Sequence, residues 1–450
     1  INGQKELAGA GLAILDSNKQ VVVVDNKQLI WTSDGVNHWV IKGLSTGVTY
    51  TLRETAAPNG YTVVADSTFS IDAQGKVKYS GTTTSNGVLL VQDKQTEVKI
   101  SKVDINGQKE LAGATLQIFD SKNQPVVDSK TNKQLIWTSD GVNVWTINGL
   151  KTGETYTLRE TAAPNGYAFV ADSTFEILAN GTVNYSGTTS KGVLLVQDTI
   201  TEVKISKTDI TGQNELAGAT LVVLDKNNQI AKDKDGKQLT WTSDGKNIWT
   251  ITGIKAGETY TLRETTAPDG YTVTADTTFT VDNSGKVTYK GTTNTNGVLL
   301  VKDELTKVTI SKVDINNQQE LAGATLEILD SKGQPVNDKK TGKPLTWKSD
   351  GVNKWVIEGL KTGETYTLRE TTAPNGYTVT ADSTFSIDAQ GNVKYSGTTT
   401  GGVLLVEDAP TKVSIRKVDI NSMQELAGAT LAILDKNGNP VNDKKTGKPL

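Results

Sequence analysis

The chain has 450 residues, no cysteine, one histidine and a formal net charge of −3. The length is too great for one hydrophobic core, the lack of cysteine excludes disulfides and cysteine-built metal sites, and the single His38 excludes a repeated histidine site. Charges of both signs are interspersed and no apolar run approaches the length of a membrane span, so neither a nucleic-acid surface nor a membrane segment is predicted.

Internal repetition sets the organisation of the chain. The segment Leu-Ala-Gly-Ala begins at Leu7, Leu111, Leu216, Leu321 and Leu426, with spacings of 104, 105, 105 and 105 residues. A period this long corresponds to a small domain and exceeds that of a solenoid unit. We therefore predict five segments: 1–95, a repeat that lacks its first strand; 96–200, 201–305 and 306–410, three complete repeats; and 411–450, the N-terminal part of a fifth. Because both ends fall inside a repeat, we expect a longer array.

Strand patterns dominate each repeat. Threonine, valine and glycine are abundant and no segment shows a sustained 3.6-residue apolar period, which indicates an all-β chain. Turn signals such as Asp140-Gly141 and Pro164-Asn165-Gly166 separate the strands. In repeat two we expect strands at residues 98–104, 115–120, 134–138, 143–148, 154–160, 168–178, 182–186 and 192–198. Seven or eight strands in one repeat predict a β-sandwich of two sheets.

The linkers between repeats are short. Only eight residues separate Asp198 from Lys207, and most of them belong to the first strand of the next repeat. No Gly-Ser or Pro-rich stretch provides flexibility there. We therefore expect tandem sandwiches arranged as an elongated rod, in which each repeat has its neighbours in the same chain as partners.

Three ionisable side chains of repeat two fall on apolar faces of predicted strands. By strand alternation, Lys102, Glu160 and Asp198 each share a face with two apolar residues: Val98 and Ile100, Tyr156 and Leu158, and Leu194 and Val196, respectively. Each such group costs several kcal/mol if it is buried charged and unpaired. The trio recurs as Lys207, Glu264 and Asp303 and as Lys312, Glu370 and Asp408. Glu54 and Asp93 belong to the first repeat, whose lysine we expect before residue 1, and Lys417 opens the fifth segment, whose carboxyls we expect beyond residue 450.

Burial favours a reaction among these three side chains. It disfavours the charged form of each group, so that the lysine tends toward the neutral amine and the carboxyls toward the acid. A neutral amine is a nucleophile, a protonated aspartic acid offers a carbonyl to attack, and a protonated glutamic acid can polarise that carbonyl and relay protons. The predicted product is a Lys–Asp amide. The residues alone leave one alternative open, a buried Lys–Glu–Asp salt-bridge cluster that does not react.

At "VKISKVDINGQKELAGATLQIFD", "TYTLRETAAPNGY" and "GVLLVQD" the repeat resembles the Cna B-type domain of Gram-positive surface proteins, and it is similar to the domain behind the SpyTag/SpyCatcher pair. This resemblance implies an immunoglobulin-like, prealbumin-type sandwich with a spontaneous isopeptide bond between its first and last strands. It implies that Lys102 in "SKVD" and Asp198 form the bond. The family's catalytic glutamate corresponds to Glu160 in "ETAAP" and to Glu54, Glu264 and Glu370 elsewhere. Departures are small, such as Thr266 for Ala162 and Asp269 for Asn165.

The leading functional prediction is a stalk or fibre region of a Gram-positive cell-surface adhesin, extracellular and anchored to the cell wall. Host extracellular matrix would be contacted through a head domain elsewhere, and no nucleic-acid or membrane partner, metal or cofactor is expected. A turnover enzyme is not predicted, because each trio is consumed in one reaction. The alternative is that the repeats themselves form a multivalent module that binds host matrix or glycans.

Two further motifs are interpreted as structural. Trp137 and Trp145 flank the Asp140-Gly141 turn, and such residues on facing strands more often form a packing pair than a sugar platform. The segment Asp233-Lys-Asp-Gly236 lacks the remaining ligands of a calcium loop. We therefore expect a polar turn there.

Overall fold

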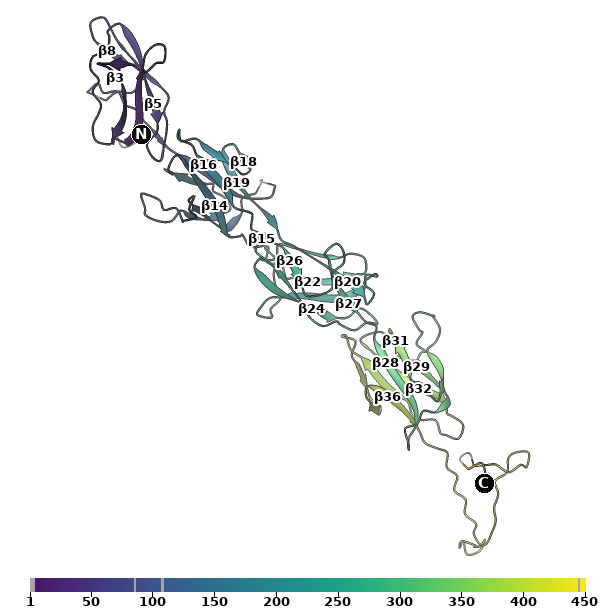
Figure 1. Ribbon diagram of the computed structural model, residues 1–450. Coiled ribbons are helices and arrows are strands. Elements are labelled where there is room, and N and C mark those ends of the chain that lie inside the picture. Colours follow the sequence, from purple (N-terminus) through teal and green to yellow (C-terminus); the bar gives the residue numbers. More distant parts are fainter. Residues whose placement is uncertain (1–4, 85, 107–108, 444–445) are drawn as a thin grey trace. The chain divides into compact units, whose positions relative to one another are not determined.

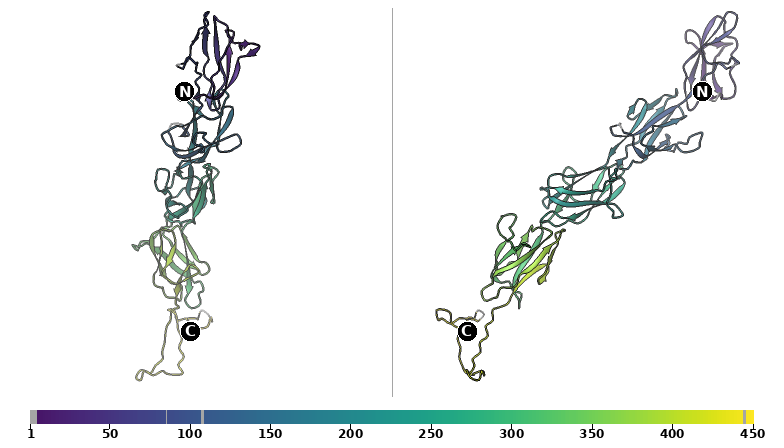
Figure 2. Two further views of the ribbon diagram at one scale, coloured as in Figure 1. Left: turned by 90° about the vertical axis from the view of Figure 1, so that its left-hand side faces the viewer. Right: turned by 180° about the vertical axis from the view of Figure 1, so that it is seen from behind.

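The computed structural model describes residues 5–84, 86–106, 109–443 and 446–450, and these residues form strands, turns and loops without a helix (Figure 1). The chain divides into two compact units, one made of Ile1–Pro268 with Val273–Glu304 and the other of Asp269–Thr272 with Leu305–Leu450. Figure 2 shows that successive β-sandwiches make up the first unit. The predicted all-β fold of tandem sandwiches is confirmed.

Repeat two, in the first unit, contains two facing sheets. The first sheet has the order β13-β10-β19-β15, with β18 paired to β19, and its strands are β10 (Glu97–Asp104), β13 (Trp145–Asn148), β15 (Tyr167–Ala168), β18 (Thr189–Ser190) and β19 (Val193–Ile200). The second sheet has the order β12-β11-β14-β16-β17, and its strands are β11 (Ala112–Phe119), β12 (Ile136–Asp140), β14 (Glu154–Ala162), β16 (Ser173–Ile177) and β17 (Val183–Tyr185).

The first and last strands of repeat two lie side by side and run parallel. β10 pairs with β19 in a register that places Lys102 opposite Val196 and Asp104 opposite Asp198. Parallel neighbours need a long crossover, and the chain between these two strands supplies it by building the second sheet. Because two register positions separate Lys102 from Asp198, both side chains point to the same face of the sheet.

Apolar side chains on the inner faces of the two sheets form one core. In repeat two the buried core residues are Val98, Ile100, Leu116, Ile118, Ile147, Leu150, Tyr156, Leu158, Phe175, Ile177, Leu194 and Val196. Each large apolar side chain that is fully buried contributes about 1.5–3 kcal/mol. A core of this size tolerates the several kcal/mol that a buried ionisable cluster costs.

Repeats three and four repeat this topology. The strands of repeat three are β20 (Glu202–Asp209), β21 (Ala217–Leu224), β22 (Thr240–Asp244), β23 (Trp249–Thr252), β24 (Glu258–Thr266), β25 (Thr277–Val281), β26 (Val287–Tyr289) and β27 (Leu299–Asp303). The strands of repeat four are β28 (Lys307–Asp314), β29 (Ala322–Leu329), β30 (Thr346–Asp350), β31 (Trp355–Glu358), β32 (Glu364–Thr372), β33 (Ser383–Ile387), β34 (Val393–Tyr395), β35 (Thr399–Thr400) and β36 (Val403–Asp408). In both repeats the first strand pairs parallel with the last.

The two ends of the chain differ from the complete repeats. Segment 1–95 has the second sheet, in the order β4-β1-β5-β7-β8, and two short strand pairs, β2-β3 and β6-β9. These strands are β1 (Ala8–Leu15), β2 (Val23–Val24), β3 (Lys27–Gln28), β4 (Ile30–Asp34), β5 (Val48–Ala56), β6 (Tyr61–Thr62), β7 (Ser67–Ile71), β8 (Val77–Tyr79) and β9 (Lys94–Gln95). The described residues of 411–450 form turns and isolated bridges but no strand.

One predicted strand is wrong. The expected strand at 168–178 is two strands, because the chain leaves the first sheet after β15 and enters the second sheet at β16.

The tryptophan packing pair is confirmed, since the rings of Trp137 and Trp145 stack with centroids 5.7 Å apart. Their strands, β12 and β13, belong to opposite sheets, so the pair packs between the sheets. The segment boundaries and the rod shape stay predictions.

Candidate functional site

Lys102, Glu160 and Asp198 meet between the two sheets of repeat two. Lys102 Nζ contacts Asp198 Oδ1 and lies 3.2 Å from Glu160 Oε1. β10 and β19 of the first sheet carry the lysine and the aspartate, and β14 of the second sheet carries the glutamate. All three side chains are 0% exposed. The structure therefore brings together the three residues that strand parity selected.

Repeats three and four contain the same arrangement. The distance from lysine Nζ to glutamate Oε1 is 3.2 Å for Lys207 and Glu264 and 3.1 Å for Lys312 and Glu370. In both repeats Nζ also contacts Oδ1 of the aspartate, Asp303 or Asp408. The three lysines sit on the first strand of their repeat and the three aspartates end the apolar part of the last strand. The geometry thus follows from the shared topology.

A β-bulge lies directly beside the glutamate. The register of β11 with β14 shifts between Thr115↔Ala162 and Leu116↔Glu160, which leaves Thr161 as an extra residue on β14. The Thr161 hydroxyl donates to the Thr115 carbonyl at 3.3 Å. Bulges of this kind re-aim side chains beside functional sites. The sequence analysis did not predict this bulge, because strand parity gives the face of a residue but not its pairing partner.

The backbone holds one oxygen of each glutamate. An amide N–H from the segment before the next strand donates to Oε2 at 3.5 Å for Val170 and Glu160, 3.0 Å for Thr274 and Glu264, and 2.9 Å for Thr380 and Glu370. An amide N–H can only donate, so Oε2 is held as an acceptor. This leaves Oε1 as the oxygen that can carry the proton of a neutral glutamic acid; in repeat two Oε1 lies 3.2 Å and Oε2 3.3 Å from Lys102 Nζ.

Burial raises the pKa of several carboxyls in these sites. Burial raises the pKa of Glu160 to about 7; the charge of Lys102 opposes this shift and the charge of Asp198 adds to it. Burial likewise raises the pKa of Asp303 to about 8 and shifts the pKa values of Asp198 and Glu370 upward. A protonated carboxyl is therefore accessible at neutral pH beside a lysine amine.

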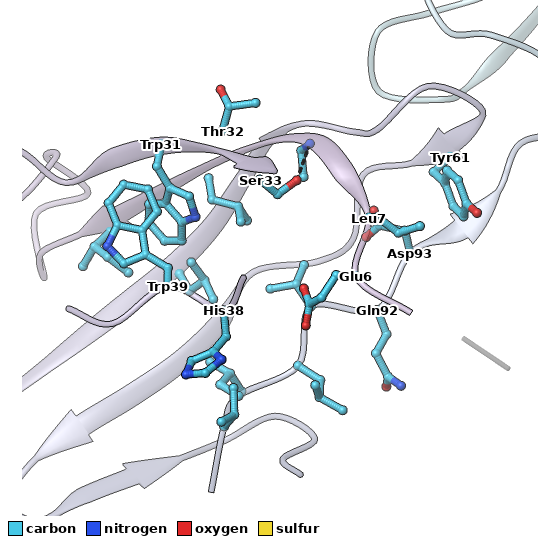
Figure 3. A pocket seen from close by; sticks show the side chains of 18 of the residues that line it. Glu6, Leu7, Trp31, Thr32, Ser33, His38, Trp39, Tyr61, Gln92 and Asp93 are labelled. Carbon is cyan, nitrogen blue, oxygen red and sulfur yellow. Dashed lines mark hydrogen bonds between the residues drawn. The ribbon is translucent and has the colours of Figure 1, made fainter. Parts of the chain in front are cut away.

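Segment 1–95 has the carboxyls without the lysine. A cavity of about 2050 Å³ lies against its sheet, lined by apolar side chains such as Leu12 and Ile14 and by Asp93, which is drawn in Figure 3. Burial raises the pKa of Glu54 to about 7 and also raises that of Asp93. The Val64 N–H donates to Glu54 Oε2 at 2.8 Å. Among the described residues, no lysine forms an ion pair with either carboxyl.

Lys417 is not part of a site in the structure. It lies in the exposed segment 411–450, and its backbone carbonyl accepts a hydrogen bond from the Leu426 N–H at 2.9 Å. Among the described residues the structure thus contains three complete trios and one pair of carboxyls, and Lys417 lies apart from them.

The described part of the chain contains no arrangement of side chains that suits a metal site. Within those residues, no three His, Cys, Asp or Glu side chains are grouped so that they could hold a metal ion. Asp233 accepts the backbone N–H groups of Asp235 and Lys237, which is the hydrogen bonding of a polar turn. The described residues also include no helix with the length and hydrophobicity that a membrane span needs.

The sequence was compared with known families, curated proteins and solved structures. The model of the SpaA prealbumin-like fold domain matches residues 1–85, 96–191, 201–296 and 306–400. The chain belongs to this family. The four matches fall on the four SpaA-type repeats that contain sheets, and they confirm the resemblance found in the sequence. No curated protein matches the chain.

Solved structures with similarity to this SpaA-type chain have low sequence identity. The Bacillus anthracis TIE protein is 19% identical over 90% of this chain and 69% of its own, with a TM-score of 0.33. A streptococcal ancillary pilin is 17% identical over 70% of this chain and 99% of its own, with a TM-score of 0.26. The shaft pilin SpaA of Lactobacillus rhamnosus GG is 18% identical over 48% of this chain and 99% of its own, with a TM-score of 0.21.

Proposed function

We propose that each complete SpaA-type repeat closes an isopeptide bond between its first and last strands and that the chain is a structural stalk or fibre region. The bonds are Lys102–Asp198, Lys207–Asp303 and Lys312–Asp408, with Glu160, Glu264 and Glu370 as proton-transfer groups. The observation that carries this proposal is the contact of each lysine Nζ with an aspartate Oδ1 inside the core, beside a buried glutamate.

The reaction in repeat two needs only the three side chains. The neutral amine of Lys102 attacks Cγ of protonated Asp198 while the Oε1 proton of Glu160 is donated toward the carbonyl oxygen. The C–N bond forms, the C–OH bond breaks, and the hydroxyl group leaves as water with a proton that came from the amine. Glu160 gives up one proton and recovers one, so it ends as it began.

Burial favours the product. An amide carries no charge, whereas the ionised pair keeps two charges in the core at a desolvation penalty of several kcal/mol per ion. The Lys102 and Asp198 side chains are both 0% exposed, so water compensates neither charge. The unreacted salt-bridge cluster is the competing state. The raised pKa values of Glu160 and Asp198 favour the neutral partners that the reaction uses.

The bond would serve a mechanical role. It joins residue 102 to residue 198 and so encloses nearly all of the repeat, which means that tension along the chain passes through the bond and does not peel the sheets apart. Closing such a loop also stabilises the repeat by ~4–5 kcal/mol, if the loop-entropy estimate for disulfides applies. A stapled array suits the extracellular surface of a Gram-positive bacterium, where we place the chain as part of a cell-wall-anchored adhesin.

Single-molecule pulling on the whole chain tests the mechanical role. Repeats two to four are expected to give no full-length unfolding step, whereas the Asp198→Ala variant is expected to give one step on the order of 350 Å of contour from repeat two. Full-length steps from repeats two to four of the unmutated chain would overturn the stalk proposal, even if the bonds form.

The alternative function, a multivalent module in which the repeats bind host matrix or glycans, requires no bond. Binding of the unmutated chain to immobilised matrix proteins, unaffected by Asp198→Ala, would favour it.

A further inference from the structure

A single buried threonine connects repeat two to repeat three within the first unit. Thr201 lies between β19 and β20 and is 1% exposed. Its N–H donates to the Gly166 carbonyl of repeat two at 3.0 Å, and its own carbonyl accepts the Gly253 N–H of repeat three at 2.9 Å. Its hydroxyl lies 2.5 Å from the Ile254 carbonyl. Every polar group of this linker residue is therefore satisfied, on one side by the preceding repeat and on the other by the following one.

Glycines permit the close approach at this junction. A Cβ added to Gly166, whose φ is +80°, would lie 2.6 Å from the Gly253 carbonyl oxygen. A second contact joins the same two repeats, because the Phe169 N–H donates to the Asn283 carbonyl at 2.8 Å. There, a Cβ on Gly285 would lie 2.7 Å from the Ala168 Cβ. At both contacts the backbone of a turn lies against the neighbouring repeat. A side chain at either glycine would prevent this close approach.

The junction between repeats one and two, in the same unit, is built in the same way. Thr96 is fully buried; its N–H donates to the Gly60 carbonyl at 2.9 Å and its hydroxyl to the Leu150 carbonyl at 2.9 Å. The Val63 N–H donates to the Asn180 carbonyl at 3.0 Å. The residues that precede these threonines differ, Gln95 in one junction and Ile200 in the other. The threonine and its bonds persist although its neighbour changes.

The second unit contains a complete and an incomplete version of this junction. The fully buried Thr306 donates its N–H to the Gly270 carbonyl at 2.9 Å and its hydroxyl to the Leu360 carbonyl at 2.8 Å. Thr411, which precedes the segment without strands, donates its N–H to the Gly376 carbonyl at 2.9 Å but is exposed. Burial of the threonine therefore accompanies the presence of a folded following repeat.

We propose that the buried threonines of the first unit, Thr96 and Thr201, with the glycines that face them, form docking sites by which one repeat binds the next repeat of the same unit in a fixed orientation. The linker is then part of the folded structure, and a bending force is resisted at the junctions as well as inside the repeats. This docking needs no isopeptide bond, because none of its groups belongs to a Lys–Glu–Asp trio. It provides the stiffness that a stalk requires between its stapled parts.

Amide hydrogen exchange on the full chain tests the docking. In the unmutated chain, the Thr201 and Gly253 amides are expected to be protected, since both donate to carbonyls in the junction. Gly166→Ala should raise their exchange rates by about tenfold or more, because the new Cβ cannot lie 2.6 Å from the Gly253 oxygen. The matched control is Gly153→Ala, which has a similar φ of +74° and no atom within 4 Å of the added Cβ.

Three further outcomes decide the proposal. Thr201→Val, which keeps the shape and removes the hydroxyl, should raise the same exchange rates by a smaller factor. The far-ultraviolet circular dichroism and the mass of Gly166→Ala should match those of Gly153→Ala, which shows that the repeats still fold and that any bonds are unchanged. The proposal is overturned if the junction amides of the unmutated chain exchange as in an unstructured peptide, or if the two glycine variants exchange alike.

Discussion

Repeats one and two carry the same two carboxyls, and only repeat two places a lysine beside them. Glu54 and Asp93 are as buried as their counterparts, and an amide N–H holds Glu54 at 2.8 Å. The carboxyl pair is therefore built without the lysine. What changes is the last strand: the described residues of 88–93 form no strand in repeat one, whereas Val193–Ile200 forms β19 along β10. The first strand thus supplies both the amine and the ladder that orders the acceptor.

The largest expected effect on stability comes from replacing one aspartate of repeat two. Asp198→Ala removes the proposed crosslink, worth ~4–5 kcal/mol, and leaves the buried Lys102 with Glu160 as its remaining ion partner. Hydrogen exchange of the repeat-two amides, measured at increasing temperature, should show a large decrease in the free energy of unfolding of this repeat. Asp93→Ala in repeat one is the control and should cost less, because no lysine among the described residues pairs with Asp93. Equal losses in the two variants would contradict the account.

Glu160→Ala should have the next largest effect. Without its proton-transfer group, repeat two keeps the Lys102–Asp198 ion pair and loses the crosslink, which lowers its stability by ~4–5 kcal/mol. Tryptic peptides should then show crosslinks from repeats three and four only. Glu54→Ala should leave all three crosslinks in place. A Lys102–Asp198 crosslink in the Glu160→Ala variant would show that the glutamate is not needed.

The pH dependence of stability should also distinguish repeat one. Burial raises the pKa of Glu54 from its ordinary value of 4.5 to about 7. The folded repeat therefore binds this proton more tightly than the unfolded chain. The stabilisation that comes from the protonated Glu54 is full below pH 4.5 and is lost as the pH rises through 7. We expect a loss on the order of 3 kcal/mol in repeat one, measured by hydrogen exchange across this range. Glu54→Gln should weaken the dependence, with the remainder of the same sign due to the raised pKa of Asp93, and a stability that rises with pH would contradict the prediction.

The smallest expected effect concerns the backbone donor. Thr380→Pro removes the N–H that binds Glu370 Oε2 at 2.9 Å, whereas Thr380→Ala keeps it. Because this bond lowers the pKa of Glu370 against the raising effect of burial, its loss should raise that pKa further. The pH profile of bond formation in repeat four, followed by mass spectrometry during refolding, should therefore shift upward in the proline variant alone. The rate should also fall by roughly tenfold, because Oε2 is no longer held in place by the N–H. A slower reaction with an unchanged pH profile would indicate a structural effect only.

Strand parity predicted more of the site than of its surroundings. Period-two alternation identified Lys102, Glu160 and Asp198 as inward-facing, and all three are buried. The same reasoning could not find the bulge at Thr161 or the Val170 N–H that reaches Glu160, because a bulge and a backbone donor leave no residue type as a signature. It also merged β15 and β16 into one strand, since no Gly or Pro marks the point between them where the chain changes sheets.

The junctions were predicted only in part. Short linkers without Gly-Ser stretches indicated stiffness, but not that Thr201 is buried between Gly166 and Gly253. Gly166 was predicted to be a turn residue, and its φ is +80°; Gly253, with a φ of +75°, was not singled out in the sequence. Their second role, close approach to the next repeat, depends on tertiary contacts that a turn motif does not encode.

The central claim is that three lysines and three aspartates of this chain are covalently joined, and the intact mass of the purified, unmutated chain tests it most directly. Each amide releases one water, so the measured mass should fall below the mass calculated from the sequence by three water molecules, one for each trio in repeats two to four. A mass equal to that of the unmodified sequence would contradict the claim and leave the buried trios as salt-bridge clusters.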